Sequence, residues 1–155
     1  MLFANRAALA LAVLLAAGGA LSAPAAAKRS LPFQPAPRGI AAPEELWHLR
    51  AGLNVAALSC RGSGRTGVAG HYSTLLARHR GVLAAAYQGE QSRHGGGAAF
   101  DRHQTRLYNR FALQRSPHRF CAAAADVAAR ANRLNSAQLG PESGRLLDEL
   151  EDSLN

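Results

Sequence analysis

The chain has 155 residues, of which 48% are hydrophobic and 18% charged, and its 18 lysine and arginine residues against 10 acidic residues give a net charge of +8. This length fits one small domain and excludes a large multidomain enzyme. The hydrophobic fraction excludes wholesale disorder. Much of that fraction is alanine, so we expect a thin core.

Residues 1–27 have the pattern of a secretory signal peptide. A short basic start at Asn5 and Arg6 precedes an apolar run over 7–21 and a stretch of small residues over 22–27. The pattern predicts cleavage before Lys28 or before Ala23. A retained membrane anchor is the alternative, but the apolar run is shorter than the roughly 20 residues that span a bilayer. We therefore expect a periplasmic or secreted protein with no transmembrane anchor in the mature chain.

The chain contains only two cysteines, Cys60 and Cys121, and both lie in the part expected to be exported. An oxidising compartment favours a disulfide between them. Closing a loop of this length stabilises a protein by roughly 4 kcal/mol in the chain-entropy model. Two alternatives are a metal site, which combines both cysteines with His118 and a further histidine, and a pair of reactive thiols.

Prolines at high density mark residues 28–42 as an arm, because proline blocks both helices and central strands. Pro43, followed by Glu44 and Glu45, is typical of a helix start. Apolar residues recur at helical spacing in five segments, and no stretch alternates like a strand. These segments are 43–60, 72–87, 100–111, 120–134 and 146–154.

Together these segments predict an all-α fold over residues 43–155. We expect a four-helix up-down bundle followed by a C-terminal helix. In such a bundle the first helix ends at the same end of the molecule where the fourth begins. Cys60 closes the first segment and Cys121 opens the fourth, so the bundle and the disulfide support each other.

The sequence also resembles a group of small exported proteins of Gram-negative bacteria. The resemblance covers roughly residues 44–131 and rests on two separated cysteine motifs and a Tyr-Asn element. These are LRAGLNVAALSC at 49–60, Leu75 to His79 with Tyr87, FDRHQTRLYNRF at 100–111, and Phe120-Cys121. It implies an exported helical domain with paired cysteines, and it carries over no activity and no catalytic residue.

The six histidines show no His-x-x-x-His or His-Glu-x-x-His spacing. His71 and His79 fall in one predicted helix but are about 12 Å apart along its axis, too far to share an ion. We therefore expect no metal ligands and no cofactor. His79 lies within an apolar arc and is predicted to be buried and neutral, with Asn54 or a tyrosine as its hydrogen-bond partner.

Arg102, Arg106 and Arg110 form a stripe with a spacing of four residues. The stripe has three interpretations: a solvated face, a face neutralised by the acidic last helix, or a site for an anionic envelope component. The last includes lipopolysaccharide, phospholipid headgroups and cell-wall polymer, because arginine binds phosphate bidentately. Export makes nucleic acid a poor candidate partner.

No nucleophile elbow, phosphate-binding loop or paired carboxylates are evident. Glu90 falls in a segment that the sequence suggests is a flexible loop, and Asp101 falls near a helix start, where the helix dipole explains it. The expected function is thus a non-enzymatic exported module that binds an envelope component or a partner protein. The alternative is a small hydrolytic or metal-dependent enzyme with an unrecognised site.

Overall fold

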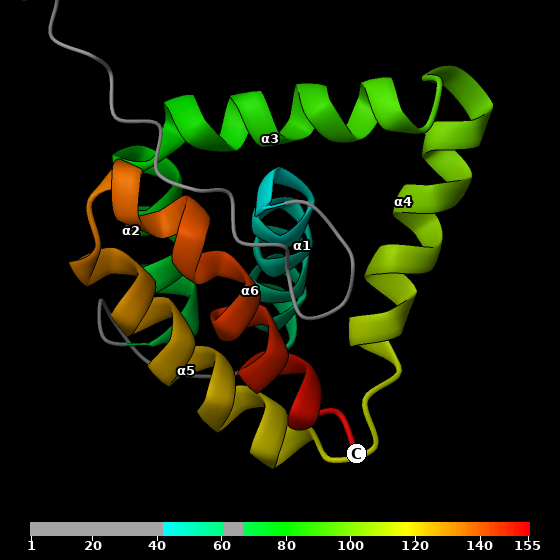
Figure 1. Cartoon of the computed structure of the whole chain (residues 1–155). Coiled ribbons are helices and arrows are strands. Elements are labelled where there is room, and N and C mark those ends of the chain that lie inside the picture. The colour runs from blue at the N-terminus through cyan, green and yellow to red at the C-terminus, as the bar shows by residue number, and fades with distance from the viewer. Residues whose placement is uncertain (1–41, 61–66) are drawn as a thin grey trace, which may run out of the picture. The chain divides into compact units, whose positions relative to one another are not determined.

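The structure is a computed structural model, and it describes residues 42–60 and 67–155 (Figure 1). All elements in these residues are helices. They are α1 (Ala42–Ser59), α2 (Val68–Arg78), α3 (Arg80–Arg93), α4 (Gly97–Ala112), α5 (Pro117–Arg133) and α6 (Ser136–Asp152). The six helices belong to one unit, Phe33–Asn155. The predicted signal peptide and the proline-rich arm up to residue 41 lie outside the described residues.

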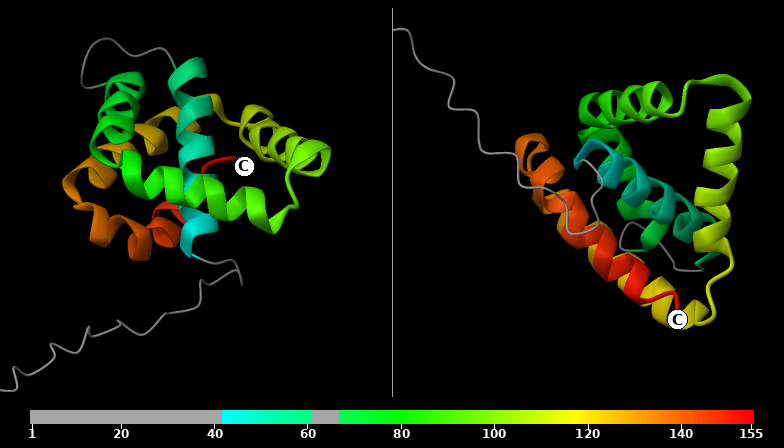
Figure 2. Two further views of the ribbon diagram at one scale, coloured as in Figure 1. Left: turned by 90° about the horizontal axis from the view of Figure 1, so that it is seen from above. Right: turned by 45° about the vertical axis from the view of Figure 1, so that its right-hand side comes forward.

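Helix α1 is the central element, because it packs against each of the other five helices. The helices α5 and α6 run side by side on one side of it, joined by a short turn (Figures 1 and 2). On the other side α3 crosses α1 and meets α4 at a corner. This arrangement brings three helices, α1, α3 and α4, together around that corner.

The predicted all-α class is confirmed, since no strand occurs in the described part of the chain. The up-down arrangement of four helices is not confirmed. The segment 72–87 was predicted as one helix, and this is wrong, because the chain bends at His79 between α2 and α3. His79 has φ −112° and ψ 18°, and its side chain is buried. The periodicity of apolar residues continues through the bend, so it does not reveal the break.

Helix α6 begins at Ser136, well before the predicted segment 146–154. A capping box starts it, in which the Asn135 side chain accepts from the backbone N–H of Gln138 and the Gln138 side chain accepts from the backbone N–H of Asn135. Pro141, which follows Gly140, lies inside the helix. The capping box therefore identifies the start of this helix better than the proline does.

The core combines a few large side chains with many alanines. Leu49, Leu53, Phe111, Phe120 and Leu150 are fully buried, and six alanines are buried among them. Because alanine side chains are small, they let the helices pack closely together.

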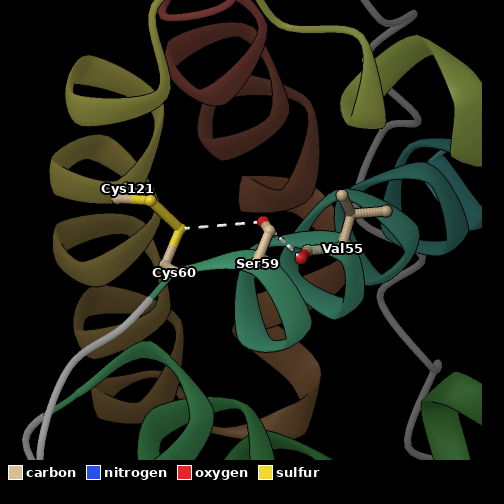
Figure 3. The surroundings of a disulfide bond; sticks show 4 residues. All are labelled: Val55, Ser59, Cys60 and Cys121. Atoms are coloured by element: carbon tan, nitrogen blue, oxygen red, sulfur yellow. Dashed lines mark hydrogen bonds between the residues drawn. A yellow bond between two sulfur atoms is a disulfide. The ribbon is translucent and has the colours of Figure 1, made fainter.

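Cys60 and Cys121 form a disulfide, with their Sγ atoms 2.04 Å apart and their Cα atoms 5.5 Å apart (Figure 3). The bond joins the end of α1 to the first turns of α5, as the sequence predicted. Ser59, beside it, donates from its hydroxyl to the Val55 carbonyl at 2.8 Å. Because both sulfurs are used, neither thiol is left for a metal site with His118.

Within residues 42–60 and 67–155, no helix has both the length and the hydrophobicity needed to cross a membrane.

Candidate functional site

Three imidazole nitrogens converge on one buried carboxylate. Glu90 is 1% exposed. Its Oε1 lies 2.5 Å from Nε2 of His103, 3.1 Å from Nε2 of His48 and 3.7 Å from Nε2 of His94. The cluster is therefore centred on a single oxygen atom.

Three different helices supply Glu90, His48 and His103, and His94 is the C-cap residue that follows α3. His48 lies in the middle of α1, Glu90 in the last turn of α3, and His103 in the second turn of α4. The chain turns between α3 and α4 through three consecutive glycines with positive φ, at 95–97. Glycine adopts this left-handed backbone without the steric cost that a side chain would bring. The corner thus places His103 of α4 against Glu90 of α3.

Side-chain hydrogen bonds hold α4 against α1 next to the cluster. Trp47 donates from its indole nitrogen to Oε1 of Gln104 at 3.0 Å. One helical turn further along each helix, the Arg50 guanidinium donates to the hydroxyl of Tyr108. The Arg50 guanidinium also lies 4.9 Å from the centre of the Trp47 ring, within cation–π range. These contacts fix the helix that carries His103.

Glu90 is ionised in this environment. Burial alone would raise its pKa, but hydrogen bonds from His48 and His103, together with their charge when protonated, outweigh burial and hold the pKa of Glu90 below its usual value. Its second oxygen, Oε2, is buried and has no hydrogen-bond partner in the described residues. A buried carboxylate with an unpaired oxygen is costly unless a cation compensates it.

Two overlapping sets of possible metal ligands share Glu90. We call His48, Glu90 and His103 the inner set, and Glu44, Glu90 and His94 the outer set. In each set the ligating atoms lie within 4.8 Å of one another. Imidazole and carboxylate are common ligands of Zn²⁺ and related ions.

One of the two distances in the inner set is close to that between the ligands of a tetrahedral ion, and the other is shorter. Zinc bonds of about 2.05 Å hold tetrahedral ligand atoms about 3.3 Å apart. The separations from Glu90 Oε1 to the nitrogens of His48 and His103 are 3.1 and 2.5 Å. Small side-chain shifts are enough to open this group around an ion.

The outer set is more exposed, and Arg93 competes with a metal ion for one of its ligands, Glu44. The His94 side chain is 27% exposed, whereas that of His48 is 10% exposed. Glu44 forms an ion pair with Arg93, in which Nε of Arg93 lies 3.2 Å from Oε2 of Glu44. The ring of His94 stacks on the ring of His103, with their centroids 3.7 Å apart and their planes at 16°.

His79, the histidine that the sequence predicts to be buried, lies outside this cluster. His79 is 1% exposed, and its Nδ1 lies 3.1 Å from Oγ of Ser136 at the start of α6. Its partner is thus Ser136 and not Asn54 or a tyrosine. Asn54 is half-buried, and the neighbouring Tyr72 hydroxyl is buried without a hydrogen-bond partner in the described residues. Burial lowers the pKa of His79, and the neighbouring charge of Arg78 lowers it further.

The arginine stripe on α4 is partly neutralised. Arg110 pairs with Glu151 of α6, with Nη2 and Oε2 2.7 Å apart. Arg102 and Arg106 are exposed on the same helix. The pairing of Arg110 agrees with the second interpretation of the stripe and reduces the charge available to an anionic partner.

Sequence reasoning missed the histidine–glutamate cluster. The assignment of Glu90 to a flexible loop is wrong, since Glu90 is buried in α3. The available signal was a glutamate followed four residues later by a histidine, which occurs at Glu44 and His48 and again at Glu90 and His94. Residues four apart share one face of a helix, although neither pair lies whole in the inner set.

Comparison with protein-family models, with curated proteins and with solved structures finds no match to this chain.

Proposed function

We propose that this protein binds one divalent transition-metal ion, Zn²⁺ or a related late first-row ion, between α1, α3 and α4. The ligands are Nε2 of His48, Oε1 of Glu90 and Nε2 of His103. The observation that carries the proposal is the convergence of these atoms, from three helices, on a buried and ionised carboxylate.

A purely hydrogen-bonded cluster explains the arrangement less well. In such a cluster Oε1 of Glu90 accepts from Nε2 of His48 and from Nε2 of His103. Oε2 of Glu90 stays buried without a partner. A divalent ion compensates the carboxylate charge and binds both histidines through Nε2, which gives up the proton that it donates to Glu90 in the metal-free protein.

The compartment belongs to the same proposal. A predicted signal peptide and a disulfide favour a periplasmic or secreted protein. Histidine and glutamate ligands suit that compartment, because they do not oxidise as thiolates do. The protein is then an exported metal-binding module, stabilised by its disulfide.

A metal titration tests the proposal. The protein is purified without a histidine tag, stripped with chelator and titrated with Zn²⁺ in a calorimeter. We expect one ion per chain for the wild type and a loss of at least about 100-fold in affinity for His48→Ala and Glu90→Gln. His118→Ala is the matched control, because His118 is exposed on α5, away from the cluster. Wild-type protein that takes up no zinc at micromolar concentration contradicts the proposal.

A second candidate function is metal-dependent hydrolysis. Three protein ligands leave the fourth position of a tetrahedral ion to water, as in catalytic zinc sites. Release of nitrophenol from an activated ester by the zinc-loaded protein, lost in Glu90→Gln, is the readout for this candidate.

A further inference from the structure

His94 and His103 cannot bind the same ion in the observed arrangement. An ion bound to an imidazole nitrogen lies in the plane of that ring. The two rings are stacked 3.7 Å apart and nearly parallel, so their planes do not meet near the nitrogens. His94 therefore serves a position different from that of the inner set, although it lies only 3.7 Å from Glu90 Oε1.

Glu90 is able to serve both positions. Its Oε1 faces His48 and His103, and its Oε2 is buried without a hydrogen-bond partner. The Nε2 atom of His94 is also buried without a hydrogen-bond partner. Glu44 lies one turn before His48 on α1, so it can complete a second set on the more exposed side.

The charges around the two positions favour one bound ion over two. The two carboxylates of Glu44 and Glu90 carry two negative charges, and Arg93 already compensates Glu44. Two divalent ions would add four positive charges to that arginine. Like charges at such separations repel strongly in a partly buried site.

We propose that the outer set, Glu44, Glu90 and His94, is the position through which a divalent metal ion reaches and leaves the inner set. This proposal rests on the proposed function. The ion first binds the outer set and displaces Arg93 from Glu44. It then exchanges Glu44 and His94 for His48 and His103 while Glu90 stays bound, and Arg93 returns to Glu44. With Glu90 ionised, Nε2 of His48 and of His103 each carry the proton that they donate to Oε1, so each nitrogen gives up this proton, to Nδ1 or to solvent, as it binds the ion.

Stopped-flow mixing of the full, disulfide-bonded protein with Co²⁺, followed by visible absorbance, tests this path. The variants are Glu44→Gln, which keeps the side-chain shape, and His94→Phe, which keeps an aromatic ring stacked on His103. His118→Ala is the control. Circular dichroism verifies that both variants fold; Glu44 lies on α1, whereas His94 is the C-cap residue that follows α3.

We expect one Co²⁺ per chain, with association and dissociation each slowed about tenfold in both variants, a range in which placed charges change binding rates. The dissociation constant then changes little, because both rates change by the same factor. Three results would overturn the proposal. They are unchanged rates in the variants, two ions per chain, or a dissociation constant raised more than about 100-fold in His94→Phe, as for a lost direct ligand. If the wild type binds no Co²⁺ at all, both the proposed function and this proposal fail. If the wild type binds Co²⁺ and the variants bind and release it at unchanged rates, only this proposal fails.

Discussion

Nε2 of His103 lies 2.5 Å from Oε1 of Glu90, although the two residues are on different helices that meet at a corner. The contact is possible because the backbone between them turns sharply at Gly95, Gly96 and Gly97. The geometry of the cluster therefore depends on a corner that only glycine forms easily. A substitution at this corner therefore tests the site without changing any of its proposed ligands.

Gly96→Ala is expected to weaken both the fold and metal binding. Gly96 has φ 68° and ψ −169°, a region of backbone space that is almost restricted to glycine. A side chain there costs about 1–3 kcal/mol or forces the corner to shift. Urea unfolding and zinc titration of Gly96→Ala measure the two effects. Gly81→Ala is the control, because no atom lies within 4 Å of its added Cβ and its φ is ordinary. Equal zinc affinity in both variants would show that the corner does not position His103.

Reduction of the disulfide is expected to destabilise the protein. The bond joins Cys60 to Cys121 across 61 residues of sequence. In the chain-entropy model the loss is up to about 4 kcal/mol, a large part of the stability of a small domain. Thermal unfolding with and without reductant measures it, and Cys60→Ser with Cys121→Ser gives the same comparison without reductant. The same melting temperature in all three samples would contradict the predicted stabilisation by the disulfide.

Gly52→Ala is expected to overpack the core. A Cβ at Gly52 would lie 2.7 Å from Cδ2 of Leu150 and 2.8 Å from Cε1 of Phe111, and both of these side chains are fully buried. Overpacking of this kind costs about 1–3 kcal/mol. Urea midpoints give the change. Gly89→Ala on α3 has only an ordinary contact, 4.0 Å from Pro43, and should be neutral or slightly stabilising. A Gly52→Ala variant as stable as Gly89→Ala would contradict this packing.

His79 is expected to make stability fall with acidification. Its pKa is lowered in the folded protein, by burial first and by Arg78 second, so the unfolded chain binds a proton that the folded chain resists. The stabilising effect is complete above the unfolded pKa of about 6.5 and is lost as the pH falls below it. Urea midpoints of zinc-free protein between about pH 7.5 and pH 5 are compared for the wild type and His79→Asn, which does not titrate there. The prediction is wrong if the two pH dependences coincide.

The fold was partly predictable because helices carry their own periodicity. The stripe of Phe100, Leu107 and Phe111 is buried, as is that of Phe120 and Val127 in the next helix. These patterns are local and record only which face of each helix is apolar. How the helices cross depends on the bend at His79 and on the glycine corner, which apolar spacing does not encode.

The site was not predictable in the same way, because its ligands come from distant parts of the chain. His48 and Glu90 are 42 residues apart in sequence. Only the pairs four residues apart, Glu44 with His48 and Glu90 with His94, leave a trace in the sequence. Joining those pairs to His103 requires the packing of α1 against both α3 and α4.

X-ray absorption at the zinc edge of zinc-loaded protein tests the central claim most directly. The account predicts a zinc ion with two imidazole ligands and one carboxylate oxygen at about 2.0–2.1 Å, with no sulfur neighbour. The same measurement on Glu90→Gln should show this environment lost. A wild-type spectrum without imidazole scattering, or one unchanged by Glu90→Gln, would contradict the account.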